Sequence, residues 1–344
     1  MFQRMCSQLA KYLNGSRPIV VWSLKVAVSV AVMLTLFTWL PLENVTRILG
    51  KADTTLVAAA GILFFGVNCL ASYKWQLLTR AQELTISFRQ AWATYFVGLF
   101  FNSFLPSGFG GDAVRAYRVA RQEGDGMDAI LSVGFDRAHS LWAILLIATP
   151  ASLHSAAMLK LPWEIGAMFT VLITVSSCLA LTFLFSVTRS WIEVGSSHLP
   201  FELGRAVSKL MRPFQKLGAN WRLIAWSSLV AITFQGLGYV VQFLLFASLR
   251  VPISFSVLVT VVSLATIVSV LPISINGIGV REGAYVMALS ATGVDSSAAI
   301  TLSVLSLAML ISNSLIGGIV FVLENRVSVG QLFRGRRDVR QHIG

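Results

Sequence analysis

The chain has 344 residues, of which 56% are hydrophobic and only 12% are charged. A soluble protein of this length carries about a quarter of its residues as charged side chains. Several runs of roughly 20 apolar residues are each long enough to cross a bilayer. The composition therefore excludes a soluble enzyme, a nucleic-acid-binding protein and a disordered chain, and it predicts an all-α integral membrane protein.

The excess of basic residues is assigned to membrane topology. The formal net charge is +12, from 27 Lys and Arg against 15 Asp and Glu, and cytoplasmic loops of membrane proteins are enriched in Lys and Arg. The three Cys residues are scattered and the chain has four His residues, so neither a disulfide framework nor a metal site is indicated. We expect no cofactor.

Eight hydrophobic segments follow one another along the chain. Six are long enough to be full spans, at residues 19–40, 54–73, 129–149, 164–186, 221–248 and 297–323. Two shorter apolar runs, 91–105 and 255–271, end at Leu-Pro and Gly and continue as a polar helix. Proline breaks the helical hydrogen-bond pattern, so these two segments are predicted to be broken helices.

The distribution of basic residues decides how the two broken helices are threaded. If both crossed the membrane, the basic segment 187–222 would lie outside, against the positive-inside rule. If both are re-entrant, residues 1–18, 74–89, 106–128, 187–222 and the tail 324–344 are all cytoplasmic. We therefore predict re-entrant hairpins at 90–121 and 254–290, a periplasmic loop at 150–163, and both termini in the cytoplasm.

With this threading, the two halves of the chain have opposite topologies. Residues 19–149 and 164–323 each hold three full spans and one hairpin. The motif LPSGFGGDAVRAY at 105–117 is also similar to LPISINGIGVREGAY at 271–285. Inverted repeats with interrupted helices at corresponding positions are typical of transporters whose site lies near the membrane midplane.

The hairpin motifs combine helix breakers with groups that bind anions. The breakers are Pro106, Gly108, Gly110, Gly111, Pro272, Gly277 and Gly279. The helix that starts after each turn has free N–H groups at its N-terminus, which form an anion site. Asp112 and Asn276 stand where an N-cap belongs, so capping and ligand contact both explain them.

Several ionisable residues lie at membrane depth, where they are costly and indicate a functional site. Asp112, Arg115 and Arg118 share roughly one helical face. Arg fits phosphate through its planar fork, although an Asp112–Arg115 structural pair and a purely topological role for Arg118 are alternatives. Asp136 and Arg137 lie in the next span. We predict that Asp136 pairs with Arg115, or Arg137 with Asp112.

Arg281 and Glu282 occupy the matching stretch of the second motif. Asn102 lies in an apolar run, where a hydrogen bond between helices explains it as well as substrate contact does. The candidate substrate-binding residues are Asn102, Asp112, Arg115, Arg118, Asp136, Arg137, Asn276, Arg281 and Glu282.

These residues carry a resemblance to a known family. FFNSFLPSGFGGDAVRAYRVAR at 100–121, the Asp136-Arg137 pair and LPISINGIGVREGAY at 271–285 resemble the lysylphosphatidylglycerol synthase transmembrane-region family, also called UPF0104 or flippase-like proteins. The resemblance covers roughly residues 17–325. It implies lipid translocation through a cavity between two inverted halves.

The resemblance also implies roles for Gly110, Asp112, Arg115, Gly279, Arg281 and Glu282. In the best understood members, this region is the flippase half of a protein that also makes aminoacylated phosphatidylglycerol. The chain ends about twenty residues after the last predicted span, so we expect no aminoacyl-transferase domain and no enzymatic activity.

The sequence thus predicts a flippase that moves an anionic or phosphate-bearing lipid (a phospholipid, an aminoacyl-phospholipid or a lipid-linked sugar) across a bacterial inner membrane. A secondary transporter of a small anion and a membrane subunit of a glycolipid or polyprenyl-lipid biosynthetic system are the alternatives, and a scaffold without transport is a third. Beyond the lipid itself, a second copy of the chain and a lipid-biosynthetic enzyme are candidate partners, and nucleic acid is not.

Overall fold

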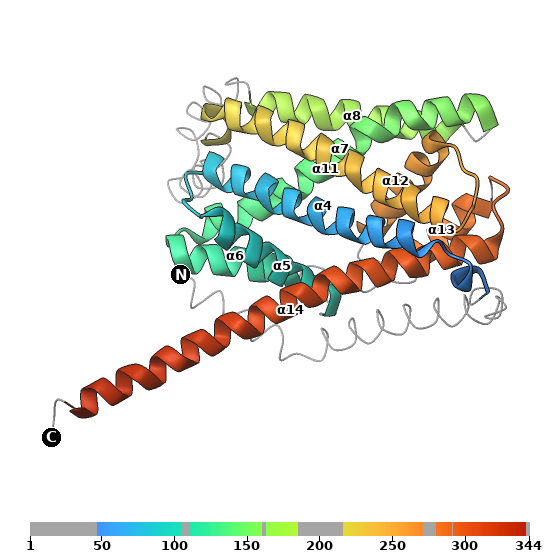
Figure 1. Cartoon of the computed structure of the whole chain (residues 1–344). Coiled ribbons are helices and arrows are strands. Elements are labelled where there is room, and N and C mark those ends of the chain that lie inside the picture. The colour runs from blue at the N-terminus through green and yellow to red at the C-terminus, as the bar shows by residue number, and fades with distance from the viewer. Residues whose placement is uncertain are drawn as a thin grey trace, which may run out of the picture.

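The computed structural model describes residues 47–104, 110–159, 163–184, 216–270, 280–290 and 292–341, and within them every regular element is a helix (Figure 1). The helices are α4 (Thr54–Ala81), α5 (Phe88–Phe104), α6 (Gly110–Glu123), α7 (Gly126–Leu159), α8 (Trp163–Leu184), α11 (Trp221–Ser248), α12 (Phe255–Val270), α13 (Val280–Ser290) and α14 (Ser296–Gln341). The predicted first span, 19–40, and most of the segment 187–222 lie outside the described residues.

Four helices in the described part of the chain are long and apolar enough to cross a membrane. They are Thr54–Ala81, Gly126–Ala157, Trp221–Ser248 and Ser297–Glu324. A span needs about 20 apolar residues, and each of these four has at least 28 residues. They confirm an α-helical membrane protein. The total of six spans and the sides on which the termini lie stay predictions.

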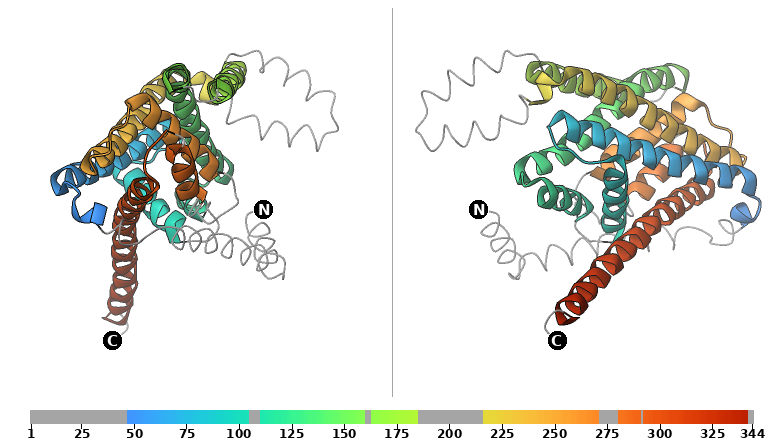
Figure 2. Two further views of the ribbon diagram at one scale, coloured as in Figure 1. Left: turned by 90° about the vertical axis from the view of Figure 1, so that its right-hand side faces the viewer. Right: turned by 60° about the vertical axis from the view of Figure 1, so that its left-hand side comes forward.

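Helix boundaries differ from the sequence prediction at three places. α4 continues past residue 73 to Ala81. α7 continues through Pro150 to Leu159, so the first part of the predicted loop 150–163 is helical. Neighbouring helices in a membrane can satisfy the backbone groups that a proline frees. α14 also extends into the basic tail, and it leaves the bundle as a long single helix (Figures 1 and 2).

The two broken segments each form a pair of packed helices. α5 packs against α6, and α12 packs against α13. The first pair lies toward the left end of the bundle in Figure 1, and the second lies toward the right end. The turns themselves, with Pro106, Gly108, Pro272, Asn276, Gly277 and Gly279, lie outside the described residues. Re-entry from opposite sides of the membrane stays a prediction.

The contacts between helices can be compared under the predicted repeat, in which α12 is the counterpart of α5. α5 packs against α14, and α12 packs against α7. The pairs α6–α7 and α13–α14 correspond in the same way, as do α4–α5 and α11–α12, and α4–α7 and α11–α14. α4 and α11 pack against each other in the centre. They run antiparallel, because the backbone N–H of Asp53 donates to Ser248 at 2.9 Å at one end and the Asn220 side chain donates to the Ala81 carbonyl at 3.0 Å at the other.

Two glycines allow the first hairpin to pack closely. A Cβ on Gly111 would overlap the carbonyl oxygen of Gly98, so α6 lies against α5 with no side chain between them. A Cβ on Gly317 would overlap the carbonyl oxygen of Phe96, which gives α14 the same close approach to α5. Small residues have this role at helix contacts in membranes.

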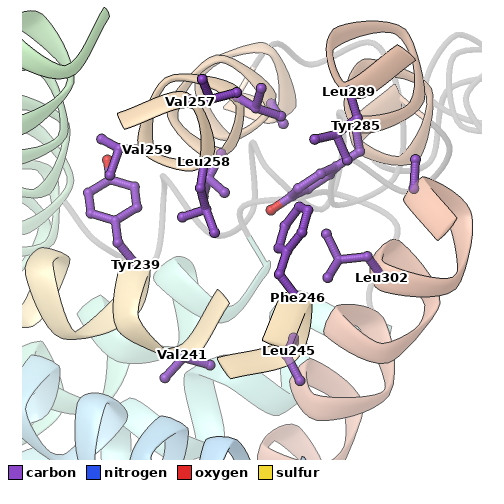
Figure 3. Packing of buried hydrophobic residues seen from close by; sticks show 14 of the residues in the cluster. Tyr239, Val241, Leu245, Phe246, Val257, Leu258, Val259, Tyr285, Leu289 and Leu302 are labelled. Carbon is purple, nitrogen blue, oxygen red and sulfur yellow. The ribbon is translucent and has the colours of Figure 1, made fainter. Parts of the chain in front are cut away.

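The largest apolar core lies in the second half of the chain. Tyr239 and Phe246 of α11, Leu258 of α12, Leu289 of α13 and Leu302 of α14 point into it (Figure 3) and are at most 2% exposed. A smaller apolar cluster around Trp75 joins α4 to α5, α6 and α7. The corresponding region of the first half is different, because charged side chains replace part of the apolar packing there.

Candidate functional site

Five charged side chains meet where α4, α6 and α7 pack together. The Nη2 atom of Arg115 lies 2.8 Å from the carboxylate of Asp136, and Nζ of Lys74 lies 3.0 Å from the other oxygen of that carboxylate. Nε of Arg137 lies 2.9 Å from the carboxylate of Asp112, and Nη1 of Arg115 lies 3.4 Å from it. We call these residues the five-charge cluster.

Four members of the cluster are almost completely buried. Lys74 is 1% exposed, Asp136 3%, Arg115 4% and Asp112 8%. Removing a charge from water costs several kcal/mol unless a partner and hydrogen bonds compensate. Each of the four has at least one opposite charge within 3.4 Å, and Lys74 also donates to the Asp136 carbonyl at 3.3 Å and to the Ser140 hydroxyl.

Aromatic rings and the first hairpin hold Arg115 in place. Its guanidinium carbon lies 4.3 Å from the centre of the Trp75 ring and 4.6 Å from that of Tyr95. Cations over aromatic faces are attracted by the ring quadrupole. The Asn102 side chain accepts a hydrogen bond of 2.8 Å from the Gly111 N–H. Asn102 therefore ties the end of α5 to the start of α6, as the hydrogen-bonding alternative expects.

Arg137 differs from the rest of the cluster because 53% of its side chain is exposed. It lies about three helical turns into α7, roughly 16 Å from the start of that helix. An ionised group inside a membrane-length helix is costly in lipid, and such groups almost always face the bundle interior or a water-filled cavity. By this rule, the exposed part of Arg137 is expected to face water and not lipid.

The cluster has a surplus of positive charge. Lys74, Arg115 and Arg137 are three cations, whereas Asp112 and Asp136 are two anions. Arg115 and Lys74 share the carboxylate of Asp136, whereas Asp112 pairs with Arg137. The exposed guanidinium of Arg137 has a fork that suits phosphate or carboxylate oxygens. An anion that reaches Arg137 would neutralise the cluster. Within the described residues, no group of three or more His, Cys, Asp or Glu side chains could hold a metal ion.

The two ion pairs predicted from the sequence are both present. Asp136 pairs with Arg115, and Arg137 pairs with Asp112. The structural pair Asp112–Arg115 is present as well, with a longer separation of 3.4 Å. Arg118 lies outside the cluster, because it pairs with Glu324 of α14 at 2.8 Å.

Lys74 was not among the predicted site residues. It was counted in the predicted cytoplasmic segment 74–89, whereas α4 continues to Ala81 and buries Lys74 beside Asp136. A lysine directly at the end of an apolar run looks like a topology signal, and only the longer helix places it at the depth of Asp136.

The candidate residues of the second hairpin lie on other helices than the five-charge cluster. Arg281 is half-buried on α13, which packs against α12 and α14, whereas the ion pairs of the cluster join α4, α6 and α7. Glu282 follows it in the same helix. Gly110 is buried as the first residue of α6. Asn276 and the remaining prolines and glycines of the hairpin motifs lie outside the described residues.

Two archaeal membrane proteins are similar to this chain. A UPF0104 membrane protein of Methanothermobacter thermautotrophicus is 23% identical over 267 residues, which cover 72% of this chain and 79% of that protein. Another UPF0104 membrane protein, of Pyrococcus horikoshii, is 24% identical over 331 residues, covering 88% of this chain and 97% of that protein.

A family model also matches most of the chain. The model of the lysylphosphatidylglycerol synthase TM region matches residues 22–317, which include both hairpin motifs and the whole five-charge cluster. The chain belongs to the lysylphosphatidylglycerol synthase TM region family.

Proposed function

We propose that this protein is a lipid flippase, a transporter rather than an enzyme, which moves an anionic or phosphate-bearing lipid between membrane leaflets. The observation that carries the proposal is the half-exposed Arg137, which lies within a membrane-length helix and belongs to a cluster with a net positive charge. Its ligand is the phosphate of the headgroup, while the acyl or prenyl chains stay in lipid.

Asp112 is the anionic partner of Arg137 when no lipid is bound. Its carboxylate lies 2.9 Å from Nε of Arg137 and leaves part of that guanidinium exposed. A headgroup phosphate binds the exposed part of the fork, where two parallel hydrogen bonds are favourable. Arg115 stays between Asp136 and the rings of Trp75 and Tyr95, and it supplies positive potential without moving.

The equivalence of the helix contacts supports a transport mechanism. If α4 and α11 are counterparts, their antiparallel packing means that the two halves have opposite orientations across the membrane. Inverted halves with broken helices at corresponding positions can expose one site alternately to each side by rocking against each other. Gly111 lets the two helices of the first hairpin pack closely, and Gly317 lets α14 pack closely against α5.

Reconstitution in sealed vesicles tests the proposal. The vesicles contain fluorescent phosphatidylglycerol or fluorescent phosphatidylcholine, and an impermeant reductant measures how fast labelled lipid reaches the outer leaflet. We expect the wild type to move phosphatidylglycerol, and Arg137→Gln to lose at least about 90% of that rate, as expected for loss of a charge-assisted contact of about 1.5–3 kcal/mol. Arg121→Gln, which removes an exposed charge from the last turn of α6, is the matched control and keeps the wild-type rate.

The same vesicles separate the proposal from the small-anion alternative. Uptake of radiolabelled inorganic phosphate without movement of any labelled lipid would favour a secondary anion transporter. Equal lipid movement in wild type and Arg137→Gln would remove the cluster from the mechanism.

A further inference from the structure

The two ends of the central helix pair α4–α11 are built alike but have different charges. Each helix ends in a residue with a positive φ that is not glycine: Glu83 after α4 (φ 65°) and Arg250 after α11 (φ 56°). The backbone bonds also correspond, because the N–H of Glu83 donates to Arg80 at 2.9 Å and the N–H of Arg250 donates to Ala247 at 3.0 Å. Glycine is usual at this position, since other residues are strained there.

At the first end, an ion pair closes the junction. Nζ of Lys216, which precedes α11, lies 3.2 Å from the carboxylate of Glu83 and 2.6 Å from that of Asp128. Burial opposes the charge of Lys216, but its hydrogen bonds to Asp128 and Glu83 outweigh burial and raise its pKa. The charges at this end are therefore satisfied within the protein.

At the second end, two cations lie at the junction. Arg250 occupies the position after α11 that Glu83 occupies after α4. Lys51 precedes α4 by three residues, and Lys216 precedes α11 by five. Together with Ile48 and Leu249 they line a cavity of about 460 Å³. Neither cation forms an ion pair with another residue in the described part of the chain.

The nearby carboxylate of Asp53 is engaged elsewhere. It caps the start of α4, where Oδ1 accepts hydrogen bonds from the N–H groups of Thr55 at 2.9 Å and Leu56 at 3.3 Å. Among the described residues, Asp53 forms no ion pair with Lys51 or Arg250. Two like charges on one small cavity repel each other, and an anion between them removes this repulsion.

We propose that this cavity binds a phosphate group between Lys51 and Arg250. A lipid headgroup and free phosphate share this chemistry. The fork of Arg250 and the point charge of Lys51 are the contacts for the phosphate oxygens, and Ile48 and Leu249 are the apolar part of the wall. The strained backbone of Arg250 fits a functional position, because strain of this kind persists where the side chain is needed.

This site is separate from the five-charge cluster. Lys74 lies 20 residues along α4 from Thr54, which corresponds to roughly 30 Å of helix. On the predicted topology, the cavity faces the outside of the cell. Binding of phosphate there is independent of the proposed transport, and a protein that moves no lipid would still have the site.

Binding to the purified full-length chain tests the proposal. All variants carry Arg137→Gln, so that the five-charge cluster contributes little. Phosphatidylglycerol and inorganic phosphate are titrated separately in a zwitterionic detergent. We expect Lys51→Gln with Arg250→Gln to weaken binding at least about tenfold, as loss of charge-assisted contacts implies. Arg47→Gln is the matched control and keeps the affinity, because Arg47 is an exposed cation in the short helix before Lys51 and does not line the cavity.

Two further variants distinguish loss of the site from misfolding. Lys51→Glu offers Arg250 a carboxylate within the protein, with the charge signs of the Lys216–Glu83 pair exchanged, so it abolishes phosphate binding and raises the melting temperature. Arg250→Gly relieves the positive φ, and it also weakens binding while the protein becomes more stable. Binding of both probes indicates a site for phosphate itself, and binding of phosphatidylglycerol alone indicates a headgroup site. No binding of either probe, or equal binding by the wild-type cavity and the doubly neutralised one, would overturn the proposal.

Discussion

Arg115 of α6 and Asp136 of α7 form an ion pair of 2.8 Å in which both side chains are at most 5% exposed. The pair connects the first hairpin to a membrane-length helix, and Lys74 of α4 shares its carboxylate. Three helices are thus held together by one acidic residue. This arrangement makes Asp136 the residue on which the stability of the cluster depends most.

Replacement of Asp136 by Asn is expected to destabilise the protein by about 3–5 kcal/mol, because it leaves Arg115 and Lys74 buried without their anion. Replacement of Lys74 by Met should cost less, since the Arg115–Asp136 pair remains. Thermal unfolding in detergent measures both. A melting temperature of Asp136→Asn equal to that of the wild type would contradict the assigned pairing.

Asp112 is expected to act as a competitor of the ligand. In Asp112→Asn, the guanidinium of Arg137 loses its anionic partner at 2.9 Å and the cluster gains one net positive charge. We expect phosphatidylglycerol to bind about threefold to tenfold more tightly, as a coupling of about 1 kcal/mol predicts. Titration of the purified variant measures this affinity, and weaker binding would show that Asp112 is part of the ligand contact and does not compete with it.

The close packing of the first hairpin predicts a sharp difference between two glycines. Gly111→Ala places a Cβ on the carbonyl oxygen of Gly98 and should cost about 1–3 kcal/mol. Gly134→Ala on α7 meets no atom within 4 Å, and it should be neutral or slightly stabilising because Ala favours the helix. The yield of folded protein and its melting temperature compare the two variants. Similar values for both would mean that α5 and α6 do not pack as described.

Arg118 is predicted to be dispensable for lipid movement. Its pair with Glu324 joins α6 to α14 at 2.8 Å, and partly exposed pairs of this kind contribute about 0–1 kcal/mol. Arg118→Gln should therefore keep the wild-type transport rate in vesicles with a small loss of stability. A complete loss of transport would place Arg118 in the substrate path after all.

The ion pairs of the five-charge cluster could be predicted from the sequence, but one of its five residues could not. Helical spacing and the hairpin motif brought Asp112, Arg115, Asp136 and Arg137 into consideration, and both predicted cross-helix pairs exist. Lys74 was missed because the depth of a charge depends on where its helix ends, and the apolar run stops several residues before α4 does.

The hydropathy pattern also did not predict where the helices end. Pro150 marks a break in sequence, yet neighbouring helices allow α7 to continue through it. In the sequence, Lys51 and Arg250 are two isolated cations on different loops. Only the antiparallel packing of α4 on α11 brings them to one cavity, so three-dimensional structure was needed to find that site.

The central claim is that the charge of Arg137 receives the lipid phosphate. The most direct measurement is the initial rate of phosphatidylglycerol movement in sealed vesicles for the wild type, Arg137→Lys and Arg137→Gln, each checked for an unchanged melting temperature. We expect Arg137→Lys to retain part of the rate, because it keeps the charge without the fork, and Arg137→Gln to lose nearly all of it. Equal rates for the three proteins would show that Arg137 does not receive the lipid phosphate.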